Sequence, residues 1–216
     1  MSPELAFILQ GMGLGFSAAT SPGAFQAYLI HQSLTNGWRA GRAASFAPLL
    51  SDAPIILLAL TVLSRLPPVF LSYLSLAGGL FISYLAWGTW KEWRRTSSSG
   101  TDQAIQDAPI PEASRPLQSL WRGALINLFG PGPYLFWGLV IGPIFLAALH
   151  TSPWQAAIFL VSFYSAMILT LLGLAWTFAW FRRFGPRLVR VLTLISILMM
   201  LGFGIILLWR GLSPLI

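Results

Sequence analysis

The stretch TSPGAFQ, residues 20–26, interrupts a long apolar run that extends from Leu5 to Ile30. A membrane-spanning helix needs about 20 mostly apolar residues, and this run is long enough to be one. Pro22 has no backbone N–H and its ring clashes with the preceding helical turn, while Gly23 is a weak helix former. The pair therefore predicts a break inside a spanning helix.

The composition of the whole chain is that of an integral membrane protein. Of its 216 residues, 56% are apolar and 9% are charged, whereas soluble domains carry about 25% charged residues. The mean hydropathy is +0.73. The chain has no cysteine, which excludes disulfides and thiolate metal sites. The net charge of +7 is typical of cytoplasmic loops that face anionic lipid, and we expect no nucleic-acid partner.

Six segments are long and apolar enough to span a membrane. Between the third and the fourth, a polar segment rich in Ser, Pro and acidic residues covers residues 96–116 and predicts a flexible linker. This linker divides the chain into two groups of three helices, residues 1–95 and 117–216. The expected spans are residues 5–30, 43–64, 67–90, 120–149, 154–181 and 188–209.

The basic residues predict how these spans are oriented. Eleven of the 13 Lys and Arg residues lie on the linker side of the predicted membrane, and Arg65 and Arg210 lie on the other side. We therefore expect a cytoplasmic linker, both termini outside, and His31 and His150 at span ends near the interface. The eleven residues are Arg39, Arg42, Lys91, Arg94, Arg95, Arg115, Arg122, Arg182, Arg183, Arg187 and Arg190.

The first break has a counterpart in the second half of the chain. SPGAF (residues 21–25) recurs 109 residues later as GPGPY (residues 130–134), and each copy lies in the first span of its half. Because three spans is an odd number, the second half enters the membrane from the opposite side, as in inverted-repeat transporters with broken helices. The pattern predicts an all-α membrane protein of six helices, built as two inverted three-helix repeats with helices one and four broken.

Each break predicts the start of a second half-helix. Ser21 and Gly130 are placed to act as N-caps, with Pro22 and Pro131 at the first helical position. The free N–H groups of such a half-helix carry a partial positive charge and bind carboxylate or phosphate. The alternative is a simple proline kink that neighbouring Ser or Thr side chains repair. The candidate substrate-binding residues at the breaks are Ser21, Pro22, Gly23, Gly130, Pro131 and Gly132.

Asp52 is the only acid well inside a predicted span. A carboxylate at that depth is costly and by default indicates function: it can carry a coupling proton, bind a substrate ammonium group or coordinate a cation. The alternative is a structural carboxylate that caps a helix broken at Pro54 or pairs with Arg42. A single acid disfavours a divalent-metal site, and we expect no metal and no cofactor. Asn127, which precedes the second break, and Tyr134 are further candidates for substrate binding.

These features resemble the LysE/RhtB superfamily of translocators. The resemblance rests on the Pro22-Gly23 break, GWRAG (residues 37–41), Asp52 and LAGGLFISYLAWGTWK (residues 76–91). NLFGPGPYLF (residues 127–136) resembles the family's Asn-Pro-Lys-Ala-x-x-Phe-Phe segment. The chain departs from the family in lacking both the second proline of its frequent Pro-Gly-Pro at the first break and the lysine at the second.

The resemblance implies a secondary transporter that exports amino acids or related small metabolites, driven by a proton or ion gradient, with a homodimer as a possible assembly. We expect the cytoplasmic (inner) membrane of a prokaryote, with membrane lipid and a small-molecule substrate as partners. Two alternatives stay open: a divalent-metal or cation exporter that uses Asp52, and a non-transporting membrane scaffold subunit. The chain has no Ser/His dyad, paired intramembrane acids or HExxH motif, so we do not expect an enzyme.

Overall fold

The computed structural model describes residues 3–61, 69–98 and 116–213, and the regular elements in these ranges are all helical. They are α1 (Pro3–Thr20), α2 (Ala24–Ser45), α3 (Ala47–Thr61), α4 (Val69–Ser98), α6 (Pro116–Phe129), α7 (Pro131–Phe136), the π-helical turn η2 (Trp137–Ile141), α8 (Gly142–Thr151), α9 (Pro153–Phe181), the 3-10 turn η3 (Arg182–Phe184) and α10 (Pro186–Leu212).

Helices long and apolar enough to cross a membrane are found in both halves of the chain. Within the described ranges there are four such stretches, Ala24–Ala59, Pro131–Thr151, Pro153–Phe184 and Arg187–Leu212. Large apolar side chains also cover the outer surface, including Tyr84, Leu139 and Trp209. Apolar residues on the outside as well as in the core are what lipid requires of a spanning helix, so the chain is a multi-pass membrane protein.

The predicted break in the first span is present, and Gln26 repairs part of it. Residues 21–23 separate α1 from α2. Because Pro22 has no N–H, the carbonyl of Ala18 loses its helical donor. The Gln26 side chain replaces that donor, since its Nε2 lies 3.2 Å from Ala18 O and 3.4 Å from Ala19 O. Two carbonyl groups at the end of α1 thereby keep a protein donor.

A second interruption of α2 occurs at Gly37, inside the GWRAG segment. Gly37 has φ +75, a conformation that glycine adopts at little cost. The guanidinium group of Arg182, from η3, lies directly against Gly37, so a Cβ at this position would overlap it. The GWRAG segment thus lies within α2 and contacts the α9–α10 corner.

The fourth predicted span is broken at Gly130, as expected. Gly130 is the N-cap of α7, with extended backbone (φ −79, ψ 134), and Pro131 occupies the start of the helix. The helix then passes through η2, and such single π turns frequently lie at functional sites. The break and η2 lie seven residues apart on the chain, so the fourth span is irregular over two helical turns.

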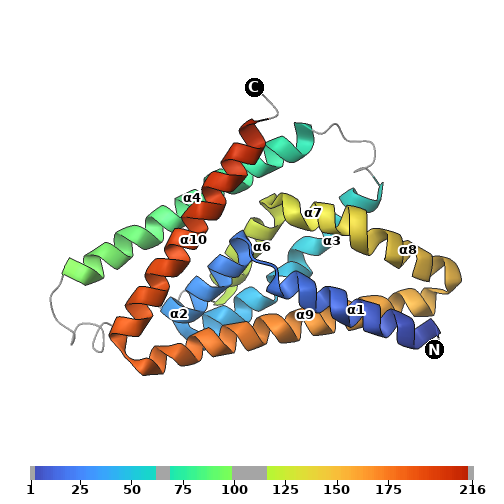
Figure 1. The fold of residues 1–216 in the computed structure, drawn as a ribbon, viewed down its shortest axis with the longest axis horizontal. Coiled ribbons are helices and arrows are strands. Elements are labelled where there is room, and N and C mark those ends of the chain that lie inside the picture. Colours follow the sequence, from blue (N-terminus) through green and yellow to red (C-terminus); the bar gives the residue numbers. More distant parts are fainter. Residues whose placement is uncertain (1–2, 62–68, 99–115, 214–216) are drawn as a thin grey trace.

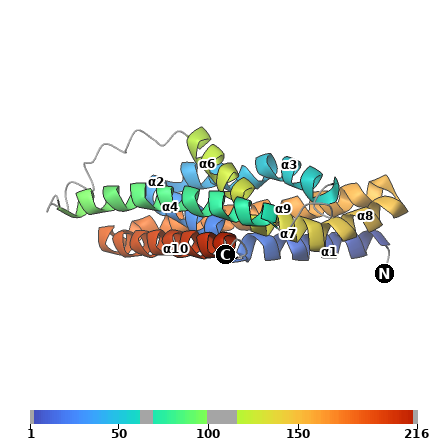
Figure 2. The same ribbon diagram turned by 90° about the horizontal axis from the view of Figure 1, so that it is seen from above.

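The two halves of the chain interlock. α1 and α2 pack against α9, α2 also packs against α6 and α10, and α3 packs against α6, while α4 pairs with α10. Figure 1 shows α1 along α9 and α4 beside α10. Figure 2 shows the same helices as a flat assembly, with α3 and α6 toward one face and α1 and α10 toward the other. Every element of one half therefore has a neighbour from the other.

The two histidines have different surroundings. His31 is buried, at 4% exposure, and its Nδ1 lies 3.3 Å from Ser196 Oγ of α10, so its side chain packs inside the protein and does not face lipid or water. The reason is that α6, α9 and α10 surround α2. His150 is exposed at the end of α8. Most of the predicted linker, residues 99–115, lies outside the described residues, as does the segment 62–68.

Candidate functional site

Asp52 is the centre of a buried polar cluster. Its side chain is 4% exposed. Asn127 Nδ2 donates to Asp52 Oδ1 at 3.0 Å, and the Tyr164 hydroxyl donates to Oδ2 at 3.0 Å. The Trp137 indole is also hydrogen-bonded to the carboxyl group. These donors come from α6, α9 and η2, so three elements of the second half converge on one side chain of α3.

Ser51 fixes the orientation of the Asn127 amide. The Ser51 hydroxyl donates to Ala47 O at 3.2 Å and accepts from Asn127 Nδ2 at 2.8 Å. The two N–H bonds of that amide are thus used for Ser51 and Asp52. The carbonyl oxygen Oδ1 of Asn127 is the part of the amide still able to accept a hydrogen bond. The cluster therefore offers acceptors, the Asp52 carboxylate and Asn127 Oδ1, to whatever binds beside it.

Aromatic packing holds the other two donors in place. The Phe163 ring packs against both, with its centroid 5.8 Å from that of Trp137 and 5.1 Å from that of Tyr164. Both contacts are edge-to-face, the arrangement that aromatic rings prefer. Trp137 and Phe163 are almost fully buried, so the rings have little freedom to turn away from Asp52.

The Asp52 carboxyl group has no cationic partner in the described part of the chain. Its hydrogen-bond donors are neutral, and the predicted alternative partner, Arg42, is an exposed residue of α2. A buried carboxylate without a counter-ion is costly to keep ionised. It is therefore suited to accept either a proton or a cationic group. Within the same ranges, no group of three or more His, Cys, Asp or Glu side chains lies together.

The second break lies directly beside this cluster. Gly130 N donates to Asn127 O at 3.3 Å, so the residue whose side chain bonds Asp52 also accepts the backbone hydrogen bond that follows α6. Pro131 and Tyr134 are buried and Gly132 is exposed. The predicted cap at Gly130 is therefore joined through Asn127 to Asp52.

The first break differs from the prediction at Ser21. Ser21 is not the N-cap of α2: its N–H and its hydroxyl both bond back to Ser17 O, at 3.0 and 2.7 Å. Gly23, with extended backbone, holds the N-cap position and provides no side-chain cap. The helix starts later because Ser21 still belongs to the last turn of α1, which leaves Pro22 in the connection. Ser21 and Pro22 are exposed.

The structure brings Asp52 and Asn127 together and adds Ser51, Trp137 and Tyr164 to them. The hydrogen bonds of Ser21 and Gln26 stay within α1, α2 and the connection between them. Sequence reasoning did not single out Trp137. No helical periodicity links it to Asn127, because the chain breaks at Gly130 between them and Trp137 begins the π-helical turn η2.

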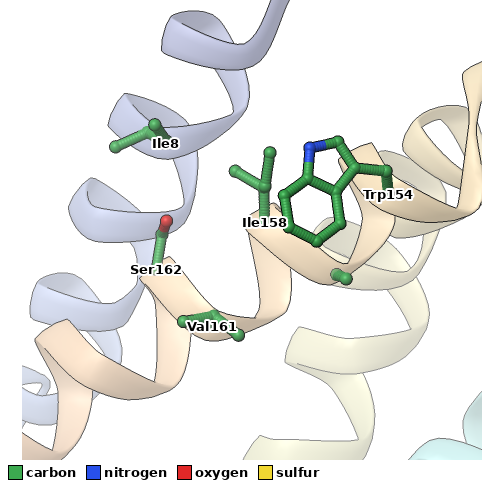
Figure 3. A pocket seen from close by; sticks show the side chains of 6 residues that line it. Ile8, Trp154, Ile158, Val161 and Ser162 are labelled. Atoms are coloured by element: carbon green, nitrogen blue, oxygen red, sulfur yellow. The ribbon is translucent and has the colours of Figure 1, made fainter.

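An open groove lies away from the cluster, between α1 and the start of α9 (Figure 3). Figure 3 shows Ile8 of α1 opposite the side chains of α9. Its lining is almost entirely apolar, as expected for a surface that faces lipid, and none of the candidate site residues contributes to it. The lining residues are Ile8, Trp154, Ala157, Ile158, Val161 and Ser162.

Comparison with known proteins gives the family. No curated protein and no solved structure matches the chain. A family model described as LysE type translocator matches residues 16–211. The match covers both breaks, Asp52 and every residue that donates to it. The chain therefore belongs to the LysE type translocators, a family of membrane transporters for amino acids or similar small molecules.

Proposed function

We propose that this protein is a secondary active transporter that exports amino acids or related small metabolites across the inner membrane, and that Asp52 carries the coupling proton. The observation that carries the proposal is the burial of Asp52 among neutral donors, with no cationic partner in the described ranges. Such a group can gain a proton when it is open to one side of the membrane and lose it when it is open to the other side.

The substrate-binding residues that we propose are those of the two breaks and the Asp52 cluster. Asp52 and Asn127 Oδ1 are acceptors, which suits a substrate ammonium group when Asp52 is ionised. The substrate carboxylate needs donors, and the N-terminus of α2 at Gly23 has no side-chain cap and keeps free N–H groups. The full proposed set is Ser21, Pro22, Gly23, Asn127, Gly130, Pro131, Gly132 and Tyr134, with Asp52 for coupling.

We further propose that residues 1–95 and 117–216 are inverted repeats joined by the 96–116 linker. Several helix contacts support this, because they occur in pairs that exchange when the halves exchange. α1 packs on α9 as α6 packs on α3, and α4 packs on its own counterpart α10. In this correspondence α2 matches the stretch from α7 to α8. Transport then proceeds by rocking one half against the other.

The proposed orientation places the linker in the cytoplasm and both termini outside. In Figure 1 the α9–α10 corner and the end of α4 lie at one side of the molecule, away from both chain ends. That corner carries Arg182, Arg183, Arg187 and Arg190, and basic residues are enriched on the cytoplasmic side. The proposed partners are a small-molecule substrate and membrane lipid, with a homodimer as a possible assembly.

Transport in proteoliposomes tests the proposed function. The purified protein is reconstituted and offered labelled amino acids or divalent metal ions, with and without a pH gradient. We expect flux of at least one amino acid, faster with the gradient. Flux of metal without amino acids would select the cation exporter instead. Absence of any flux, together with co-purification of a large partner, would select the scaffold subunit.

A further inference from the structure

A second buried polar cluster joins α2 to α6. The Tyr28 hydroxyl donates to Ser119 O at 3.1 Å, and Ser119 Oγ donates to Gln32 Oε1 at 3.2 Å. Asn36 Nδ2 also donates to Gln32 Oε1, at 2.7 Å. Tyr28, Gln32 and Ser119 are each at most 4% exposed. The two hydrogen bonds of Ser119 cross from the first half of the chain to the second.

This cluster lies closer to the linker than Asp52 does. Ser119 is in the first turn of α6, which begins at Pro116 directly after the linker, and Asn127 follows eight residues later. With a rise of 1.5 Å per residue, the two clusters are about 12 Å apart along α6. A solute that moves between the linker side and Asp52 along α6 therefore passes Tyr28, Gln32 and Ser119.

The helices are in tight contact between the two clusters. Gly123 of α6 lies halfway, and a Cβ there would be 2.9 Å from Ala47 Cβ and 3.4 Å from Tyr28 Cε1. No room for a solute is left where α2, α3 and α6 meet at this level. The path from the linker side is thus closed by packing as well as by hydrogen bonds.

Two further contacts hold α2 from its other sides. Ser196 of α10 donates its hydroxyl to Thr193 O at 2.8 Å, and its Oγ lies 3.3 Å from His31 Nδ1. The Arg182 side chain lies against Gly37. The linker-side part of α2 is therefore attached to α6, α10 and η3 at once.

The opposite side of the molecule lacks an equivalent closure. The counterparts of α2 and α6 in the proposed repeat are α8 and α1. α8 packs mainly against α9, and in the described part of the chain no extensive contact links it to α1. The extensive packing of α2 on α6 thus has no counterpart on the opposite side. A protein that works by alternating access closes the path on one side while the other side is open.

We infer that Tyr28, Gln32 and Ser119 form the linker-side gate of the transport path, and that the structure has this gate closed. The inference rests on the proposed transport function and adds the residues that control access to its site. For substrate to reach Asp52 from the linker side, α2 must move away from α6, which breaks the hydrogen bonds of Ser119 with Tyr28 and Gln32.

Thiol accessibility tests the gate without any substrate. The chain has no cysteine, so Ser51→Cys introduces a single thiol at the Asp52 cluster. A membrane-impermeant maleimide is applied to the linker side of oriented vesicles. We expect slow labelling with the gate intact, and roughly tenfold faster labelling when Tyr28→Phe or Gln32→Leu removes a gate hydrogen bond. Tyr84→Phe and Gln10→Leu, at exposed positions, are the matched controls and should leave the rate unchanged.

Two results would overturn the inference. The first is rapid labelling of Ser51→Cys from the linker side with the gate intact, and the second is equal labelling rates in gate variants and controls. If the gate variants do not fold, a short bifunctional thiol reagent should cross-link Gln32→Cys to Ser119→Cys in the substrate-free protein, and failure to cross-link would contradict the closed gate. Neither measurement needs transport, so a negative flux assay would count against the proposed function alone.

Discussion

At the level of single residues, the Asp52 carboxyl group is held by side chains that stabilise it without neutralising it. Asn127, Trp137 and Tyr164 are all neutral donors, and hydrogen bonds to a charged group are stronger than those between neutral groups. Protonation of Asp52 would convert one acceptor into a donor and weaken this set. Occupancy of Asp52 by a proton or cation is thereby linked to the contact between the two halves.

The Tyr164 hydrogen bond gives a direct test of that stabilisation. We expect Tyr164→Phe to lower the free energy of unfolding by about 1.5–3 kcal/mol, because it removes a donor from a buried carboxyl group. Thermal unfolding in detergent measures the change. Tyr84→Phe, which alters an exposed tyrosine of α4, is the control. Equal melting temperatures for the two variants would show that the Tyr164 hydroxyl contributes nothing to the fold.

The polar members of this cluster could be predicted, and the aromatic ones could not. Asp52 and Asn127 stand out in the sequence because a polar side chain inside an apolar span needs a partner. Trp137 and Tyr164 do not stand out, since aromatic residues in such helices usually pack. Ser21 was predicted as a cap from its residue type, but its hydroxyl found the nearer carbonyl of Ser17.

At the level of elements, the first break depends on a side chain that bridges it. Gln26 of α2 supplies the donor that Pro22 withholds from α1. We expect Gln26→Leu to destabilise the protein by about 1–3 kcal/mol, because two carbonyl groups lose their donor. Gln10→Leu, at an exposed position of α1, is the control. Unchanged thermal stability of Gln26→Leu relative to that control would mean that water or lipid head groups satisfy these carbonyls instead.

The second break depends on close approach by α4. Gly78 lies against the carbonyl of Phe129, which precedes the break, and a Cβ at Gly78 would overlap that oxygen. We expect Gly78→Ala to cost about 1–3 kcal/mol through overpacking. Gly88→Ala, in the same helix, has nothing within 4 Å and should be neutral or slightly stabilising. Comparable melting temperatures for the two alanine variants would contradict this account of the α4 contact.

At the level of the whole molecule, hydropathy and charge predict spans and sides, but not which helices touch. The boundaries of α9 and α10 agree with the predicted spans 154–181 and 188–209 to within about three residues. The packing of α2 among α6, α9 and α10 could not be predicted, because contacts between distant spans leave no periodic signal in the sequence. For the same reason the burial of His31 was missed.

The orientation can be checked with single thiols in this cysteine-free chain. We expect Thr101→Cys, in the linker, to react with an impermeant maleimide from the cytoplasmic side. Ser213→Cys, at the end of α10, should react from the outside, because the basic residues gather at the linker side. Labelling of both from one side would require an even number of spans between them and would contradict the six-span proposal, which places three there.

The central claim, that Asp52 couples protons to substrate movement, is tested most directly by measuring substrate-driven proton flux in proteoliposomes. A gradient of a transported amino acid is imposed and the lumenal pH is followed with a dye. We predict proton movement opposite to the substrate in the native protein and in the control Glu4→Gln, which removes an exposed acid. Folded Asp52→Asn should show no substrate-driven proton flux. Proton flux in Asp52→Asn at the native rate would contradict the account.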